Sequence, residues 1–424
     1  MIKKIRRILG LVLANLIFLL LLFSTSNKQP LTEKKIPHWT INSMHSCNRT
    51  ITRLPKDIQD SGKEWTGRNT SYFYSAYNDY RTNSVVIISI VLTGSFDYYC
   101  TLWFEQEHRI RVSKAIVVII PDTHQKRYLG SFLRCYNPSK SKPSAVSISS
   151  APCSRPLVTL QIVYPDKLGN KEKHWCLSPI HGNPLTGYLE AVTLHKLIGI
   201  DRATIYTSNK TAEKHLKNLD WIDVIHWQIP VHVNDIHYYG QCAAINDCLY
   251  RNMFSNRYMI FTDLDEIFLP RRNSPGQILF DKLLWQDLDT MQLERNNTIS
   301  SFYGSSYLFG TPENLTSLAS VNVVKRYQKP NIYRRKYIII PNRIDYLSVH
   351  KTYSYPSYDE IFIPKSIAML HHYRRCPEPE TNCLGVRKMY NPIMIDEFAL
   401  SLLEPIISLS TNLSITMQLH SEFS

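Results

Sequence analysis

The sequence predicts an α/β protein whose main domain is built on a mainly parallel sheet, preceded by a β-rich module and one membrane-spanning helix. Three observations predict this class. Strand-like and helix-like segments alternate after residue 157, apolar β-branched runs occupy residues 84–156, and an uncharged apolar run lies near the amino terminus. Strands that alternate with helices are typical of a parallel sheet covered on both faces.

The composition is that of a globular protein with a basic surface. Of the 424 residues, 44% are hydrophobic and 20% are charged, and the formal net charge is +14. A basic balance suits nucleic acid, anionic membrane surfaces or anionic small substrates. The sequence contains no zinc-finger spacing, RNP-like run or long basic arm, so we expect no nucleic-acid partner.

The amino terminus indicates the compartment. Residues 8–23 form an uncharged apolar run, and they follow four basic residues, Lys3, Lys4, Arg6 and Arg7. The run would span roughly 24 Å as a helix, which is near the thickness of an early-secretory bilayer. A cleaved signal peptide is the alternative, but a clear A-x-A site is missing. We therefore expect a cytoplasmic tail (1–7), a transmembrane signal anchor (8–23) and a lumenal remainder, as in single-pass type II proteins of the Golgi or ER membrane.

Cysteines and glycosylation motifs agree with a lumenal address. None of the nine cysteines forms a C-x-x-C pair, so disulfides are expected rather than a zinc ribbon or a thioredoxin site, with a local bridge between Cys376 and Cys383. N-x-S/T motifs occur at Asn48, Asn69, Asn209, Asn296, Asn314 and Asn412. The chain is thus predicted to be a glycoprotein.

Composition shifts divide the lumenal part. Residues 24–83 are polar and proline-containing, which predicts a stem, and residues 84–156 predict the β-rich module, with strands at 84–92 and 114–120. Residues 157–403 predict the main domain and 404–424 a tail. The main domain is expected to contain strands at 157–163, 202–207, 221–227 and 258–261, and helices at 187–199, 211–218 and 239–254.

The chemistry is predicted at the end of the last of these strands. Asp263 and Asp265 follow an apolar run, next to Glu266, and Pro270 ends the segment. A strand that leaves the core here would deliver acids at its carboxyl end, where open α/β sheets bind ligands. Two acids at this spacing could project to the same side of an extended chain and ligate one hard cation, which would suit a diphosphate substrate. A solvated acidic turn is the simpler alternative.

Several motifs in a fixed order carry a family resemblance. Segments 239–251 and 257–270, with 174–179, 188–190, 349–351 and 372–374, resemble glycosyltransferase family 92, and the resemblance covers residues 157–403. It implies a GT-A fold with a Rossmann-like sheet, a nucleotide-sugar donor and a divalent metal, typically Mn²⁺. It further implies an inverting galactosyltransferase that uses UDP-galactose and a glycan acceptor.

The resemblance also implies roles for particular residues. Asp263, Asp265 and Glu266 become the catalytic acids, and the two aspartates hold the metal. His350 is the first choice for a further metal ligand, and His371 and His372 are the alternatives. The donor is expected to contact Asp247, Arg251, Lys351 and Arg374.

The general base and two rival functions stay open. An inverting transferase needs a carboxylate base, and the candidates are Glu313, Asp359, Glu360, Asp396 and Glu397. The string around Asp263 also fits a haloacid-dehalogenase-type phosphatase, with Asp263 as nucleophile and Asp265 as acid/base. The other rival is a lumenal glycan-binding protein that keeps the fold without catalysis.

Overall fold

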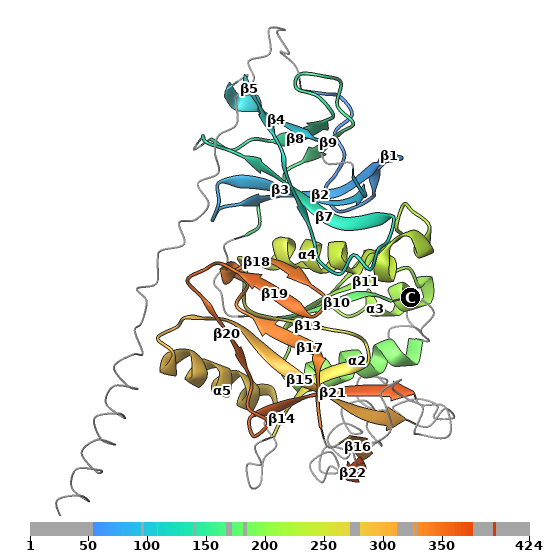
Figure 1. Cartoon of the computed structure of the whole chain (residues 1–424), viewed down its shortest axis with the longest axis vertical. Coiled ribbons are helices and arrows are strands. Elements are labelled where there is room, and N and C mark those ends of the chain that lie inside the picture. The colour runs from blue at the N-terminus through green and yellow to red at the C-terminus, as the bar shows by residue number, and fades with distance from the viewer. Residues whose placement is uncertain are drawn as a thin grey trace, which may run out of the picture. The chain divides into compact units, whose positions relative to one another are not determined.

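The computed structural model of the chain is rich in strands and contains several antiparallel sheets (Figure 1). It describes residues 54–94, 97–107, 109–139, 141–166, 172–180, 185–271, 280–311, 325–327, 329–375 and 393–395. The predicted tail, anchor and C-terminal segment (1–7, 8–23 and 404–424) lie outside these residues, as does the predicted Cys376–Cys383 bridge. Within the described part, no helix is both long and apolar enough to cross a bilayer.

The amino-terminal module consists of two antiparallel sheets. The first has the order β1-β2-β3-β7-β6 and the second β5-β4-β8-β9. Two of these strands, β1 and β2, fall in the segment predicted as a stem, and β9 is the strand predicted to open the main domain. The bounds are β1 Thr66–Arg68, β2 Ser71–Asp79, β3 Ser84–Leu92, β4 Tyr99–Phe104, β5 Arg109–Lys114, β6 Ile116–Ile119, β7 Tyr128–Tyr136, β8 Ala145–Ser149 and β9 Val158–Gln161.

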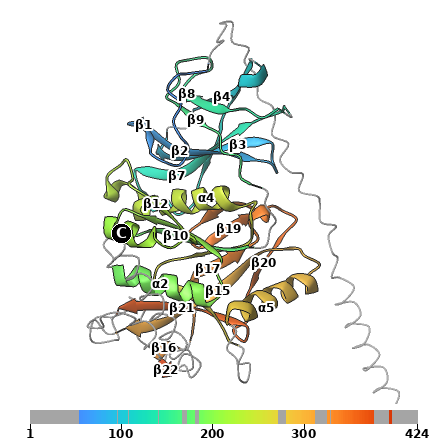
Figure 2. The same cartoon turned by 180° about the vertical axis from the view of Figure 1, so that it is seen from behind.

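Strand β3 shows why this module is attached to the rest of the protein. Val85 and Ile87 pack into the core between the two sheets of the module. Val86 and Ile88 alternate with them and pack into a second core, which includes residues of helix α4 (Gln241–Asn252). Because successive side chains of a strand point to opposite faces, an unbroken apolar strand is buried on both faces. Figures 1 and 2 show α4 between the module and the main sheet.

One half of the main sheet confirms the predicted alternation. Strands β12, β11, β10 and β13 lie side by side and are parallel. Their bounds, with those of the connecting helices, are β10 Glu172–Ile180, α2 Leu185–Leu197, β11 Arg202–Thr207, α3 Lys210–Leu216, β12 Ile222–His226 and β13 Asn256–Thr262. The predicted strand at 258–261 and helix at 239–254 correspond to β13 and α4.

The other half corrects the predicted fold class. Strand β17 pairs antiparallel to both β13 and β15, so the eleven-stranded sheet is mixed, and the prediction of a mainly parallel sheet was wrong. Apolar periodicity identifies a strand, but the connection sets its direction, and parallel pairing needs a crossover. The remaining elements are β14 Glu266–Pro270, α5 Phe280–Glu294, β15 Ile299–Thr311, β16 Lys325–Tyr327, β17 Asn331–Ile339, β18 Ile344–Ser348, β19 Lys351–Ser354, β20 Asp359–Phe362, β21 Ala368–Arg375 and β22 Ile393–Ile395.

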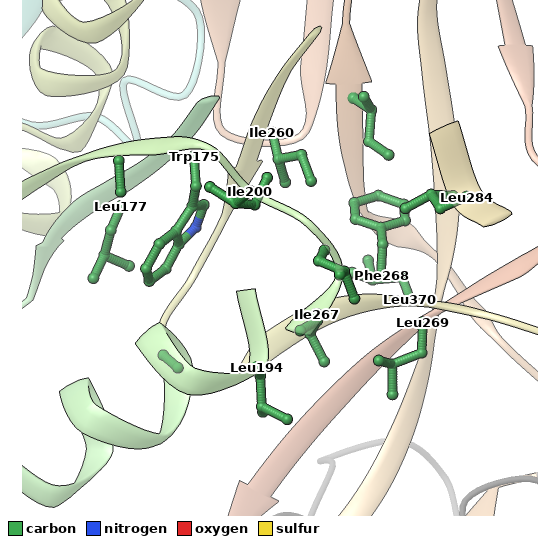
Figure 3. Packing of buried hydrophobic residues seen from close by; sticks show 14 of the residues in the cluster. Trp175, Leu177, Leu194, Ile200, Ile260, Ile267, Phe268, Leu269, Leu284 and Leu370 are labelled. Atoms are coloured by element: carbon green, nitrogen blue, oxygen red, sulfur yellow. The ribbon is translucent and has the colours of Figure 1, made fainter. Parts of the chain in front are cut away.

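A dense apolar cluster supports the carboxyl end of β13. Ile260 packs with Trp175 of β10, and with Ile267 and Phe268 of β14 (Figure 3). Leu194 of α2 belongs to the same cluster. The turn between β13 and β14 therefore starts and ends in rigid, buried strands.

Disulfides join elements in each part of the chain. Cys100 of β4 is bonded to Cys135 of β7, which links the two sheets of the module. Cys176 of β10 is bonded to Cys248 of α4, which fixes that helix to the sheet. Among the described cysteines Cys242 is free and buried. These bonds agree with the sequence-based expectation of disulfides rather than metal-binding thiols.

Candidate active site

The predicted acids lie on a tight turn, residues 263–266, rather than on an extended segment. This turn is called the acid turn below. The backbone N–H of Glu266 donates to the carbonyl of Asp263 over 3.1 Å, and the N–H of Asp263 donates to Oε2 of Glu266 over 3.0 Å. Aspartate is favoured at the first position of such turns. The third residue, Asp265, is held because its carbonyl accepts from the N–H of Tyr373 on β21 over 2.8 Å. The side chains of Asp263 and Asp265 therefore contact different residues, which are described in turn below.

Asp263 is held by two donors from within the protein. Nζ of Lys336, on β17, donates to its Oδ2 over 2.8 Å, and Nε2 of Gln241, at the start of α4, donates to its Oδ1 over 3.0 Å. Burial alone would raise the pKa of Asp263, but the Lys336 ammonium lowers it overall. Both carboxylate oxygens of Asp263 are therefore already engaged with protein donors.

Glu266 completes a buried charge cluster with Lys336. Its side chain is 1% exposed, and its Oε2 lies 3.5 Å from Nζ of Lys336. Burial raises the pKa of Glu266 to about 7, although Lys336 acts in the opposite direction. Burial would lower the pKa of Lys336, but the charges of Asp263 and Glu266 raise it overall. The lysine thus stays charged and offsets negative charge beneath the turn.

Asp265 faces solvent and is paired with a histidine. Its side chain is 46% exposed, and its Oδ2 lies 3.3 Å from Nε2 of His372 on β21. The other ring nitrogen of His372, Nδ1, lies 3.4 Å from Oε1 of Glu266. Burial would lower the pKa of His372, but the hydrogen bond to Asp265 and the charge of Glu266 raise it overall.

Asp265 and His372 fit a divalent cation in donor type and spacing. A carboxylate oxygen and an imidazole nitrogen are ligands that Mn²⁺ accepts, and neighbouring donors of an octahedral ion lie about 3 Å apart. Within the described part of the chain, the one cluster of three metal-ligating side chains with all ligand atoms mutually within 4.8 Å is His174, Cys176 and Cys248. Its two sulfurs form a disulfide, so that cluster is not a thiolate metal site.

His350, the first choice for a further metal ligand, lies on the Asp263 side of the turn. Its Nδ1 donates to the carbonyl of Arg335 over 3.1 Å. Burial and the charge of Lys336 lower its pKa to about 4, so the ring is neutral near pH 7. Among the described ion pairs, His372 is the histidine that joins the acids of the turn.

The structure places Asp247 and Arg251 in a buried network between the module and the main sheet. Asp247 is fully buried and accepts hydrogen bonds from Ser75 over 2.5 Å, Tyr77 over 2.8 Å and Tyr206 over 2.6 Å. Arg251 pairs with the same carboxylate over 3.0 Å. Asp247 lies six residues, or about 9 Å, along α4 from Gln241. These contacts join the module to the main sheet.

The other predicted residues are spread over several elements. Lys351 is exposed on β19, with its ammonium over the ring of Tyr353. Arg374 lies on β21, two residues beyond His372, and His371 is buried beside Tyr373. Of the base candidates, Asp359 accepts from Thr298 and Glu360 from Thr352. Glu313, Asp396 and Glu397 lie outside the described residues.

Sequence reasoning missed Lys336 and Gln241. Lys336 ends a run of three basic residues, 334–336, that reads as a solvated face, yet it adjoins the apolar residues 337–340. A lysine that enters a buried strand needs an acidic partner, which is the signal that could have identified it. Gln241 gave no comparable signal, because only the packing of α4 brings it to Asp263.

Comparisons with known proteins identify the family of the chain. The model of the family described as Glycosyltransferase family 92 matches residues 171–398. This range includes the whole acid turn, His350 and His372. A curated relative from Caenorhabditis elegans, named Beta-1,4-galactosyltransferase galt-1, is 31% identical over 122 residues, or 26% of this chain and 28% of the relative. The chain thus matches less than a third of the relative's length. Because the family model covers more than half of the sequence, the chain belongs to glycosyltransferase family 92.

Proposed function

We propose that this glycosyltransferase transfers galactose from UDP-galactose to a glycan acceptor, with inversion and with a divalent cation held by Asp265 and His372. The observation that carries the proposal is the Asp265–His372 pair, 3.3 Å apart at the carboxyl end of a parallel strand. Galactose as the donor sugar is supported by the printed name of the C. elegans relative. When bound, the cation would stabilise negative charge on the departing diphosphate.

The residues around the pair would prepare it for this role. Lys336 offsets the charge of Asp263 and Glu266, so the turn does not repel an anionic donor as strongly as three unpaired acids would. Glu266 contacts Nδ1 of His372, which leaves Nε2 directed at Asp265. A partner on the second ring nitrogen is the usual way in which proteins orient a metal-binding histidine.

The proposed compartment is the lumen of the secretory pathway. Two intramolecular disulfides lie within the described residues, and such bonds persist in oxidising compartments. The family supplies the reaction class, so the phosphatase alternative has no remaining support. The other alternative, a glycan-binding protein that keeps the fold without catalysis, is tested by the experiment below.

The decisive experiment separates the two aspartates. Asp265→Asn and His372→Ala should each lower galactose transfer from UDP-galactose by about 100-fold or more and weaken Mn²⁺ binding, measured by electron paramagnetic resonance. Asp263→Asn should keep most Mn²⁺ binding, because Asp263 contacts Lys336 and Gln241 instead.

A matched control is Asp223→Asn, at the amino-terminal end of β12, with its exposed carboxylate paired to Arg202. It should leave metal binding and transfer unchanged. Full transfer by the Asp265→Asn variant, or undiminished transfer in excess chelator, would refute the metal role. Metal binding without transfer from any nucleotide sugar would point to the non-catalytic alternative.

A further inference from the structure

Two loops meet beside the acid turn, and one of them comes from the amino-terminal module. The module loop (residues 120–127) connects β6 to β7, and the domain loop (residues 227–240) connects β12 to α4. Nζ of Lys126 donates to the carbonyl of Asn234 over 3.0 Å. The rings of His124 and His237 stack with their centroids 3.6 Å apart. The module therefore reaches the main domain through specific contacts.

The same two loops border the acid turn on the side of Asp263. Oδ2 of Asp122 accepts hydrogen bonds from Oγ of Ser348 over 2.7 Å and from the N–H of Val349 over 2.9 Å, directly before His350. The domain loop leads into Gln241, which donates to Asp263. Tyr238 lies three residues before Gln241, so their Cα atoms are at most about 11 Å apart.

Backbone conformations in these loops are unusual. Of the ten described non-glycine residues with positive φ, five lie here: Asp122, His124, Gln125, Tyr238 and Tyr239. Such conformations cost free energy and persist where the surroundings enforce them, often at ligand-binding sites. Neither loop is a relaxed connection.

The strained loops present an aromatic surface to solvent. Tyr238 is 66% exposed although it is a large ring, and His237 packs edge-on against it with centroids 4.5 Å apart. His124 is also exposed and extends this surface onto the module. An exposed ring held in place on the rim of a site is a suitable platform for an amphipathic ligand.

We propose that Tyr238, His237 and His124 form an acceptor platform, on which a sugar ring of the acceptor glycan stacks during transfer. This inference rests on the proposed function. A pyranose presents an apolar face of C–H groups and a rim of hydroxyls, so it stacks on an aromatic ring while it keeps its hydrogen bonds to water. The module then has a defined task, since it supplies His124 and, through Asp122, holds the platform against the strand that precedes His350.

The test uses the full-length chain on a glycan array in the presence of UDP and Mn²⁺. Wild type should bind a subset of arrayed glycans, and Tyr238→Ala should weaken that binding by several-fold to about tenfold. Tyr238→Trp should retain binding because it keeps a stacking face. Asp122→Ala, which releases the module loop, should weaken binding in the same direction as Tyr238→Ala.

Donor measurements separate this inference from the proposed function. Retention on immobilised UDP and hydrolysis of UDP-galactose without acceptor should be unchanged in Tyr238→Ala, because the platform is proposed to contact the acceptor alone. The control Tyr136→Ala changes an exposed tyrosine at the far end of β7, about 26 Å along the strand from Tyr128, and should change nothing.

Three results would overturn the platform. They are glycan binding that Tyr238→Ala leaves unchanged, no binding of wild type to any arrayed glycan, and a loss of UDP retention in Tyr238→Ala. The last result would identify Tyr238 as a contact of the nucleotide. If donor hydrolysis were absent in wild type while glycan binding depended on Tyr238, the platform would stand and the proposed catalysis would fail.

Discussion

At the scale of single residues, the acid turn divides its charges between two tasks. Asp263 and Glu266 pair with Lys336 of β17, whereas Asp265 pairs with His372 of β21. A D-x-D spacing by itself suggests two equivalent metal ligands. In the structure the two aspartates are inequivalent, because Asp263 accepts hydrogen bonds from Lys336 and Gln241, whereas Asp265 pairs with His372.

Lys336 offers a direct test of that division. Lys336→Met should lower the free energy of unfolding by about 3 kcal/mol, since it leaves two carboxylates near the core without their cation. Lys336→Arg keeps the positive charge and should lower the free energy of unfolding by less. Urea unfolding followed by tryptophan fluorescence measures both, and equal stability of wild type and Lys336→Met would contradict the assignment.

At the scale of elements, strand β13 is held behind the turn by helix α2. Oγ1 of Thr262, directly before Asp263, accepts from Nε1 of Trp175 over 3.0 Å and lies 3.2 Å from Nε2 of His195. Nδ1 of His195 lies 2.8 Å from the carbonyl of Ala191. If Nδ1 of His195 carries the proton, it donates to the Ala191 carbonyl, and Nε2 accepts from the Thr262 hydroxyl. Each polar group in this series of hydrogen bonds then has a partner while the imidazole is neutral.

The buried histidine predicts a dependence of stability on pH. Burial lowers the pKa of His195 to about 3, against the smaller effect of its bond to Ala191. Below the unfolded pKa of about 6.5 the unfolded state binds a proton that the folded state does not, so stability falls as pH falls from about 6.5 towards 3. The slope should be about 1.4 kcal/mol per pH unit for this one group.

Unfolding in urea at pH 7, 6 and 5 measures that slope. His195→Gln should reduce the slope by about 1.4 kcal/mol per pH unit, which is the contribution of one proton. His215→Gln, on helix α3, is the matched control for replacing a histidine with glutamine away from Thr262. Parallel pH curves for wild type and His195→Gln would show that His195 does not titrate with folding.

At the scale of the whole molecule, exposure discriminates among the glycosylation motifs. Asn69 and Asn296 are exposed, whereas Asn209 is half-buried and its side chain caps α3 through the N–H of Ala212. In a eukaryotic secretory host we therefore expect N-glycans at Asn69 and Asn296, with lower occupancy at Asn209. A glycan at Asn209 would have to displace the cap.

Peptide mass spectrometry after glycosidase treatment in heavy-oxygen water measures each occupancy. Asn69→Gln and Asn296→Gln should each remove one glycan without altering transfer. Unmodified Asn69 and Asn296 in a secreted, folded chain would contradict the expectation and weaken the proposed lumenal address.

Much of the parallel half of the main domain was predictable from local pattern. Residues 202–207 were predicted as a strand and form β11, and the predicted helix at 239–254 contains α4. The acids were found because Asp263 follows an apolar strand at its carboxyl end. The antiparallel half was not predicted, since the direction of β17 depends on its partners β13 and β15 rather than on its own residues.

The sequence by itself determined the family, the reaction class and the position of the acid turn, because these depend on residue types at fixed spacing. Tertiary structure alone decided which groups surround that turn. Lys336 and His372 lie 73 and 107 residues beyond Asp263 and Asp265, and Gln241 lies 22 residues before Asp263. Sheet pairing and helix packing bring them within hydrogen-bonding or ion-pairing distance, and no local pattern encodes such pairing.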